Sequence, residues 1–406
     1  MSDAQFMRLA LRLARRGYGT TSPNPMVGAV LVKNGKIIGQ GWHRRAGESH
    51  AEVEAVRDAH KRDHSTKGAT LYVTLEPCST HGRTPPCTEA IKAARVKSVV
   101  VGATDLNPKH RGKAFKILKR AGIAVTTLSD LARWAEAAVE PRSGSRGRSP
   151  HQKLADECAR LNEAFNHWIV HRTPFVIVKA AMTLDGKIAT ASGESKWITG
   201  EKARVFAMKL RRGADAILVG VNTILTDNPS LTLRARNAER GMRNDGKPLR
   251  RIVLDAMART PLNAKIVDDE HAALTTIVVS KVAPKKRVAA LARRVKVIAA
   301  PTVKSRIEHG KSKIDLRWLL KKLGNENVTN LLVEGGGEVN ASFLLGGFAQ
   351  RVKFFYAPKI LGGRDARKAV AGDGVQRLEE ITQLREVEWR RLGPDLLLTA
   401  RVGPAS

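Results

Sequence analysis

The chain has 406 residues, a length that exceeds one ordinary hydrophobic core and predicts two domains. Its formal net charge of +33 would suit a nucleic-acid partner, but aromatic residues make up only 4% of the chain, which argues against a stacking platform for single strands. A basic surface also attracts phosphorylated small molecules, and we expect this kind of partner rather than nucleic acid.

Hydropathy and cysteine count indicate the compartment. Hydrophobic residues form 42% of the chain, yet no stretch approaches about 18 consecutive apolar residues. We therefore expect neither a signal peptide nor a membrane span. The three cysteines form no disulfide framework, and an odd number fits a reducing compartment, so we expect a cytoplasmic protein.

Helices and strands alternate through residues 1–140. An amphipathic helix begins near Phe6 and ends at Gly17, and Asn34-Gly35 predicts a type I′ hairpin between two strands. The other elements of this half are predicted as helices at 50–60, 87–95, 115–121 and 128–138, and as strands at 27–32, 69–75, 96–101 and 123–127. This alternation predicts an α/β layer whose ligands gather at the strand ends.

A candidate zinc site lies between His50 and Cys87. One imidazole, from His50, and two thiolates, from Cys78 and Cys87, supply three ligands and leave the fourth position for water, as in catalytic sites. Glu52 follows His50 by two residues, as in the H-x-E signature of zinc deaminases, where this glutamate moves protons and is not a ligand. Zinc lowers the pKa of water toward about 7. We therefore predict Zn²⁺ with Glu52 as the catalytic residue.

Two other interpretations of this cluster remain. The first is a structural zinc site, which would require a fourth protein ligand, and Cys158 is far along the chain. The second is a group of unrelated buried side chains. The gap between Cys78 and Cys87 is longer than the two-residue gap of the general deaminase signature.

A Gly/Ser/Arg segment at 141–150 is too polar to pack and is predicted as a flexible tether, with RNA contact as the alternative. Strands are then predicted at 174–179, 214–220, 251–255, 274–280, 295–299 and 330–334. The last strand leads into Gly335-Gly336-Gly337 and an apolar helix, where backbone N–H groups can approach a phosphate. A tight turn explains a glycine triplet nearly as often, and the spacing is not that of a Rossmann fingerprint.

Several segments together resemble one family, the bifunctional riboflavin-biosynthesis deaminase/reductases. These segments are 22–28, 41–48 and 76–87 in the first half, and 184–186, 192–199 and 223–227 in the second. The resemblance implies an α/β protein with a cytidine-deaminase-like three-layer domain at 1–140, and a dihydrofolate-reductase-like α/β domain at 171–406. The segment 141–170 would then be a basic linker with a connecting helix.

The resemblance also implies two reactions on a phosphorylated pyrimidine. The first is zinc-dependent hydrolytic deamination of the diaminopyrimidinone ribosyl phosphate, and the second is reduction of its ribosyl group to a ribityl chain by NADPH. A homodimer or higher homo-oligomer, formed through the reductase half, is expected on the same ground.

Residue roles carried over from the family are expectations of the same kind. Asn24 and His43 should hold the pyrimidine, with His81, Arg83 and Thr84 along the substrate loop. The residues expected to bind NADPH are Ala181, Trp197, Thr223, Asp227, Gly335, Gly336, Gly337, Glu338, Val339, Asn340, Ala341 and Ser342. The residues expected to bind the second substrate are Ser195, Arg211, Leu231, Arg234 and Glu334, with Lys179 and Asp185 as further candidates.

These roles have plainer alternatives. Asn24 could serve a turn between Pro23 and Pro25, and Trp197 could equally be a core residue. The segment 109–115 departs from the glycine-rich turn common in the family, which bears on local geometry near the deaminase pocket. Competing functions are a nucleoside or tRNA deaminase fused to an unrelated reductase-like domain, and a non-catalytic RNA-binding protein.

Overall fold

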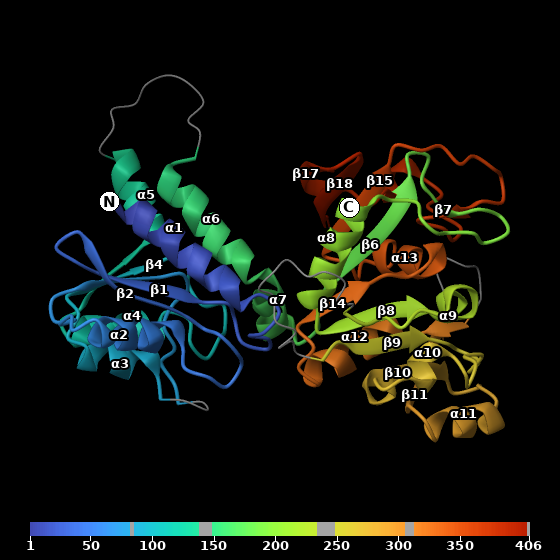
Figure 1. The fold of residues 1–406 in the computed structure, drawn as a ribbon, viewed down its shortest axis with the longest axis horizontal. Coiled ribbons are helices and arrows are strands. Elements are labelled where there is room, and N and C mark those ends of the chain that lie inside the picture. Colours follow the sequence, from blue (N-terminus) through green and yellow to red (C-terminus); the bar gives the residue numbers. More distant parts are fainter. Residues whose placement is uncertain (82–84, 138–147, 234–247, 305–311, 404–406) are drawn as a thin grey trace. The chain divides into compact units, whose positions relative to one another are not determined.

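The computed structural model describes residues 1–81, 85–137, 148–233, 248–304 and 312–403. The chain divides into two compact units, Met1–His171 and Arg172–Ser406 (Figure 1). Three predicted site residues or segments lie outside the described residues: Arg83 with Thr84, most of the tether (141–147), and Arg234.

The first unit is built on a five-stranded sheet in the order β2-β1-β3-β4-β5. Its strands are β1 (Gly28–Lys33), β2 (Lys36–Trp42), β3 (Thr70–Val73), β4 (Ser98–Val101) and β5 (Ala124–Thr127). β1 pairs antiparallel with β2 and β3, while β3, β4 and β5 are parallel. The predicted hairpin is confirmed, because Asn34 (φ 52°) and Gly35 (φ 72°) both adopt the left-handed conformation that a type I′ turn requires.

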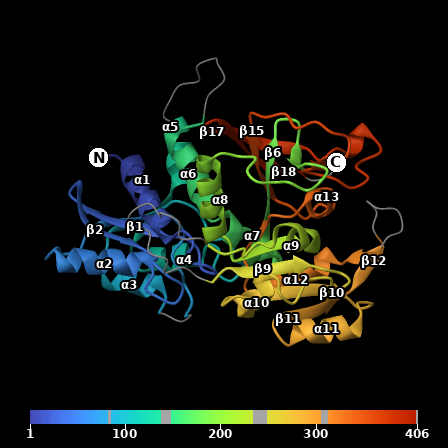
Figure 2. The same cartoon turned by 45° about the vertical axis from the view of Figure 1, so that its right-hand side comes forward.

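Helices cover both faces of this sheet, which confirms the three-layer prediction (Figures 1 and 2). One face carries α1 (Asp3–Ala14), α5 (Leu128–Ala137) and α6 (Pro150–Leu161). The other carries α2 (Ala51–Lys61), α3 (Cys87–Ala93) and α4 (Lys113–Arg120). Each helix places an apolar stripe on the sheet, so the core forms two clusters, one on each side.

The segment after the tether belongs to the first unit. Sequence analysis assigned Ser149 and Pro150 to the linker, but Ser149 is the N-cap of α6, accepting the Gln152 N–H, and Pro150 is its first residue. A second helix, α7 (Glu163–His171), follows, and Asn162 between them bonds both the N–H and the carbonyl of Met26 at 2.8 and 2.9 Å. Cys158 is buried in the core under α1, which agrees with a structural role.

The second unit contains a nine-stranded sheet in the order β11-β10-β9-β8-β14-β6-β15-β18-β17. Its strands are β6 (Phe175–Thr183), β8 (Ala216–Gly220), β9 (Arg250–Leu254), β10 (Thr275–Ser280), β11 (Lys296–Ala300), β14 (Asn330–Val333), β15 (Arg351–Ala357), β17 (Leu384–Leu392) and β18 (Asp395–Val402). All neighbours from β11 to β15 are parallel, and β15, β18 and β17 are antiparallel. The six predicted strands are present, whereas the C-terminal three were not predicted.

Helices and two short ribbons complete this unit. The helices are α8 (Glu201–Arg212), α9 (Val221–Asp227), α10 (Lys265–Asp268), α11 (Lys285–Ala292), α12 (Leu316–Asn325) and α13 (Gly337–Leu344). The ribbons pair β7 (Lys187–Ala189) with β16 (Arg367–Lys368), and β12 (Thr302–Lys304) with β13 (Ser312–Ile314).

The sheet of the second unit brings three predicted segments together. Val333 at the end of β14 is level with Val178 in β6 and Leu218 in β8. Glu334, which directly follows β14, therefore lies beside Lys179 within β6, and β8 continues to Gly220 at the start of α9. Within the described parts of the chain, no helix combines the length and apolarity needed to cross a membrane.

Close packing of α1 on β1 yields a test of the fold. A Cβ atom added at Gly28 would lie 2.0 Å from the Ala10 carbonyl oxygen and 2.6 Å from the Ala14 nitrogen. We expect Gly28→Ala to destabilise the first unit by about 1–3 kcal/mol or more through overpacking. Hydrogen exchange should accelerate across α1 and β1 while strands of the second unit, the internal control, exchange as in wild type. Unchanged exchange in α1 would contradict this packing.

Candidate active sites

His50, Cys78 and Cys87 converge in the first unit although they come from three separate elements. His50 is the N-cap of α2, Cys87 is the first residue of α3, and Cys78 lies in the turn after β3. Their ligand atoms all lie within 4.8 Å of one another. The His50 Nδ1 atom is 3.1 Å from the Cys87 Sγ and 3.5 Å from the Cys78 Sγ. Two soft thiolates and one imidazole around a single point fit tetrahedral Zn²⁺ with one open position.

The electrostatics of the two thiols favour metal binding. The Cys78 Sγ accepts the Cys87 backbone N–H at 3.2 Å. Hydrogen bonds from Cys87 and His50 lower the pKa of Cys78, whereas the hydrogen bond to Cys78 and burial raise the pKa of Cys87. A second thiolate beside the first is unfavourable without a cation, so the cluster calls for one.

Glu52 is the buried acid of this site. It lies in the first turn of α2, is 3% exposed, and its Oε2 atom has no hydrogen-bond partner among the described residues. Burial raises the pKa of its carboxyl group. An unpartnered buried oxygen is costly unless a ligand or water completes it. Its position suits proton transfer at the open side of a metal.

The two residues expected to hold the pyrimidine also lie here. Asn24 Nδ2 is 3.2 Å from His43 Nε2, and the His43 Nδ1 is 3.1 Å from the Ser49 carbonyl oxygen. The His43 ring packs edge-on against the His50 ring at 5.2 Å. Burial lowers the pKa of His43, which favours the neutral ring. His81 is exposed on the segment between the two cysteines.

Arg211 and Glu334 form a buried ion pair in the second unit. The Arg211 Nε and Nη2 atoms each lie 2.9 Å from a Glu334 oxygen, and Lys179 Nζ lies 3.7 Å from Glu334. Burial alone would raise the pKa of Glu334, but attraction by Arg211 and Lys179 lowers it to about 2. The Arg211 Nη1 atom donates to the Thr232 carbonyl at 3.3 Å, beside buried Leu231. Arg211, expected to bind the second substrate, therefore has a carboxylate partner that sequence analysis did not predict.

Residues expected at the cofactor adjoin those expected at the substrate. The Ser195 hydroxyl donates to Asp227 at 3.2 Å, and Thr223 lies in the first turn of α9. Trp197 is 61% exposed, with the Arg204 guanidinium 4.8 Å above its ring, so the core alternative for Trp197 is wrong. Ala181 lies on β6, opposite Phe355 of β15. Asp185 accepts the Leu361 and Gly362 N–H groups and so anchors that loop.

The glycine triplet leads directly into α13. Gly336 is its N-cap, so the N–H groups of Gly337, Glu338 and Val339 lack intrahelical partners. A Cβ atom at Gly336 would meet nothing within 4 Å, whereas one at Gly337 would lie 2.4 Å from the Lys368 carbonyl. The side chains of Asn340 and Ser342 instead bond the Ala369 and Glu338 carbonyls. The open part of the predicted loop, at Gly336–Val339, fits a cofactor phosphate.

Sequence analysis missed two buried acids beside the cysteines. Glu76 is 3% exposed and Asp105 is 7% exposed. Burial raises the pKa of both carboxyl groups, and for Asp105 the Cys78 sulfur adds to the rise. The sequence feature that could have identified Glu76 is its position, as an acidic residue between a buried strand and the Pro77-Cys78 pair.

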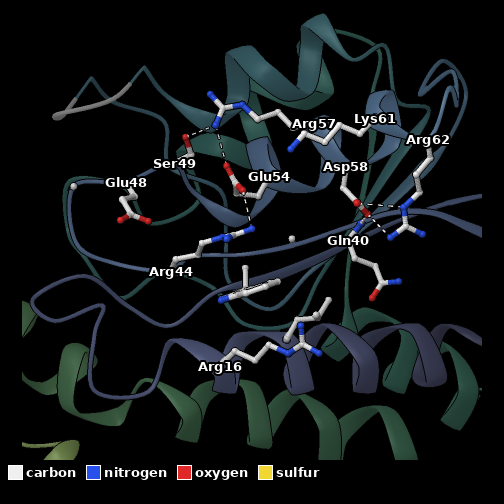
Figure 3. A pocket seen from close by; sticks show the side chains of 14 residues that line it. Arg16, Gln40, Arg44, Glu48, Ser49, Glu54, Arg57, Asp58, Lys61 and Arg62 are labelled. Atoms are coloured by element: carbon white, nitrogen blue, oxygen red, sulfur yellow. Dashed lines mark hydrogen bonds and ion pairs between the residues drawn. The ribbon is translucent and has the colours of Figure 1, made fainter. Parts of the chain in front are cut away.

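A cavity of about 700 Å³ lies elsewhere in the first unit, between α1, β2 and α2 (Figure 3). None of the predicted site residues lines it. Glu54 pairs with Arg57 at 2.9 Å and Arg44 at 3.6 Å, while Asp58 pairs with Arg62 at 3.0 Å (Figure 3). These pairs balance part of the positive charge of the cavity, and the lining residues show that it is distinct from the two candidate sites.

Comparison with known proteins matches both units. Residues 1–103 match the cytidine and deoxycytidylate deaminase zinc-binding region, and residues 174–398 match the RibD C-terminal domain. The riboflavin biosynthesis protein RibD of Actinobacillus pleuropneumoniae is 39% identical over 98% of this chain and 95% of its own length. That of Aquifex aeolicus is 40% identical over 98% and 97%.

Solved structures agree over the whole length. RibD of Acinetobacter baumannii superposes with a TM-score of 0.80 at 32% identity, covering 99% of both chains. A diaminohydroxyphosphoribosylaminopyrimidine deaminase/5-amino-6-(5-phosphoribosylamino)uracil reductase from Thermotoga maritima does so with a TM-score of 0.78 at 31% identity, again covering 99% of both. A fusion to an unrelated reductase is therefore wrong, because residues 174–398 match the RibD C-terminal domain and the relatives match along both units. The chain belongs to the family of the riboflavin biosynthesis protein RibD.

Proposed function

We propose that the two clusters described above carry the two reactions of this bifunctional family. The chain is a zinc-dependent deaminase and an NADPH-dependent reductase of riboflavin biosynthesis. It deaminates 2,5-diamino-6-ribosylamino-4(3H)-pyrimidinone 5′-phosphate and then reduces the ribosyl group to a ribityl chain. The observation that supports the residue assignment most strongly is the unpartnered Glu52 oxygen beside three converging metal ligands.

In the first unit, His50, Cys78 and Cys87 would hold Zn²⁺, which makes a water molecule nucleophilic near neutral pH. Glu52 would take a proton from the attacking water and pass it to the departing amine, so that a C–O bond forms as the C–N bond breaks and ammonia leaves the ring. The raised pKa of the buried Glu52 carboxyl suits a group that must both take and release a proton. Asn24 and His43, hydrogen-bonded to each other, orient the pyrimidine.

In the second unit, Gly336–Val339 would receive a phosphate of NADPH, which supplies the hydride. The Ser195 hydroxyl, proposed to bind the substrate, donates a hydrogen bond to Asp227, proposed to bind the cofactor, so the two binding sites would adjoin each other there. Lys179 of β6 and Arg211 of α8 both pair with Glu334, which directly follows β14. We assign Glu334, Ser195, Leu231 and, outside the described residues, Arg234 to substrate binding. The role of Arg211 is then to hold Glu334 ionised as well as to contact substrate.

Assembly and compartment are proposals of the same kind. β17 forms an edge of its sheet, and eight of its nine residues are exposed, including Trp389, 58% exposed, and Val387, 49% exposed. An exposed edge strand with apolar side chains is a surface that a second copy can cover. We propose a homo-oligomer formed through the reductase unit. The three unpaired cysteines suit the cytoplasm.

The role of Glu52 predicts a separation of zinc binding from turnover. We expect Glu52→Gln to lower the rate of ammonia release by about a hundredfold to ten-thousandfold, because proton transfer is lost. Zinc content, measured by atomic absorption, should equal that of wild type because Glu52 is not a ligand. NADPH oxidation should remain normal when the deaminated product is supplied.

Glu54→Gln is the matched control, since Glu54 lies on the same helix but pairs with Arg57. Its ammonia release should match wild type. Loss of zinc in Glu52→Gln, or a wild-type rate of ammonia release, would contradict the assignment.

The glycine triplet predicts a selective effect on NADPH. Gly336 has φ −71°, which any residue adopts, so Gly336→Ala should fold normally. Its methyl group would enter the space proposed for the phosphate, and we expect the KM for NADPH to rise about tenfold or more. Gly337→Ala, by contrast, should lower the melting temperature because of the 2.4 Å approach to Lys368. An unchanged NADPH KM in Gly336→Ala would show that the phosphate binds elsewhere.

A further inference from the structure

Within the part of the chain that the structure describes, the hydrogen bonds of Glu76 go to residues 103–114, which connect β4 to the first turn of α4. Its Oε2 atom accepts the N–H groups of Asp105 at 3.2 Å and Gly112 at 3.0 Å. Its Oε1 atom accepts the Ala114 N–H at 3.3 Å, and its own N–H donates to the Ala103 carbonyl at 2.8 Å. A buried carboxylate is costly, and three N–H donors to its oxygens offset that cost.

The start of α4 depends on this carboxylate. Gly112 is the N-cap of α4, with φ 72°, and no side chain of the helix itself caps the end. Glu76, from a different element, accepts N–H groups of both the N-cap and the first turn. Sequence analysis noted that 109–115 departs from the family's glycine-rich turn, and Glu76 is the group that holds this segment in place.

The same connection lies along the metal ligands. Asp105 is buried, and its carboxyl group interacts electrostatically with the Cys78 sulfur. Further along, the His110 ring lies 3.4 Å from the Thr80 hydroxyl, two residues after Cys78. Glu76 is therefore linked to Cys78 in two ways. Its main chain is followed directly by Pro77 and Cys78, and its side chain hydrogen-bonds the segment that lies beside Cys78.

We propose that Glu76 is a positioning residue for deamination, which holds residues 105–112 as a preformed wall of the zinc pocket. This role rests on the proposed function for the identity of the substrate. Without the carboxylate, the wall would have to order itself when the pyrimidine binds, and part of the binding energy would be lost to that ordering. The effect should therefore fall on substrate binding more than on zinc.

Glu76→Gln tests the proposal with little change in size. The glutamine amide presents one NH₂ group to backbone N–H donors, so it cannot accept all three hydrogen bonds. We expect kcat/KM for ammonia release to fall about 10- to 100-fold, mainly through KM, with zinc content as in wild type. NADPH oxidation with the deaminated product should be unchanged, which shows that the second unit is intact.

Thr66→Val is the matched control. The buried Thr66 hydroxyl donates to the Ala94 carbonyl at 2.8 Å, at the end of α3 away from Cys87, so this variant also loses a buried hydrogen bond. It should lower stability and leave the KM for ammonia release unchanged. If both variants lose activity in proportion to stability, Glu76 has a structural role only. Loss of zinc from Glu76→Gln would assign Glu76 to ligand support instead.

Two further measurements distinguish the proposed role of Glu76 from a failure of folding and from an error in the proposed substrate. Hydrogen exchange of the Asp105, Gly112 and Ala114 amides, measured without substrate, should accelerate about tenfold or more in Glu76→Gln. This readout stands even where wild type releases no ammonia, a result that would overturn the proposed substrate and not the wall. If Glu76→Gln does not fold, Glu76→Asp keeps the carboxylate with a shorter reach and should show an intermediate KM. Unchanged amide exchange, or a wild-type kcat/KM, would overturn the proposal.

Discussion

The candidate deaminase site depends on one constraint: a carboxyl group must be buried beside the three proposed metal ligands with one of its oxygens left unpartnered. Glu52 satisfies this because it lies in the first turn of α2, directly after the N-cap residue His50, and is buried there with its Oε2 atom unpartnered among the described residues. Burial raises the pKa of this carboxyl group, which suits the proton transfer proposed for it. Much of the surrounding structure supports this arrangement. Cys87 begins α3, Cys78 follows β3, and His43 is turned toward Asn24 by the Ser49 carbonyl.

The candidate reductase site has a different electrostatic requirement, which is to keep a buried carboxylate ionised. Glu334 is buried at the end of β14, where it would take up a proton without cationic neighbours. Arg211 from α8 and Lys179 from β6 keep it ionised, so three elements must meet with correct geometry. Such a group is stable only when its members are all present, since removing one leaves an uncompensated buried charge.

The Lys and Arg side chains that give the chain its positive charge have several separate roles rather than one shared function. Arg251 is fully buried and uses its donors on Asp269, Thr275 and two carbonyls. Arginines around the cavity of Figure 3 pair with Glu54 and Asp58. Net charge alone therefore gave weak guidance, because it does not distinguish paired from solvated cations.

Short-range patterns in the sequence determined much of this protein. The spacing His50-x-Glu52 with Cys78 and Cys87 predicted the zinc ligands and the acid, and the strand before the glycine triplet indicated the cofactor loop once the family resemblance was added. Hydrophobic periodicity predicted most strands, since each buries a continuous apolar run. It did not predict β15, β17 and β18. Of these, β17 is exposed at eight of its nine residues and therefore has no buried apolar run.

The tertiary structure alone decided which polar groups meet. Nothing in the chain order pairs Arg211 with Glu334, Asn162 with Met26, or Glu76 with the amides of residues 105–114. Local patterns report the conformation of a segment, whereas a hydrogen bond or ion pair between distant segments exists only once the sheet has set their register. The candidate reacting groups were therefore identifiable from the sequence, whereas their ionisation and orientation were decided by the fold.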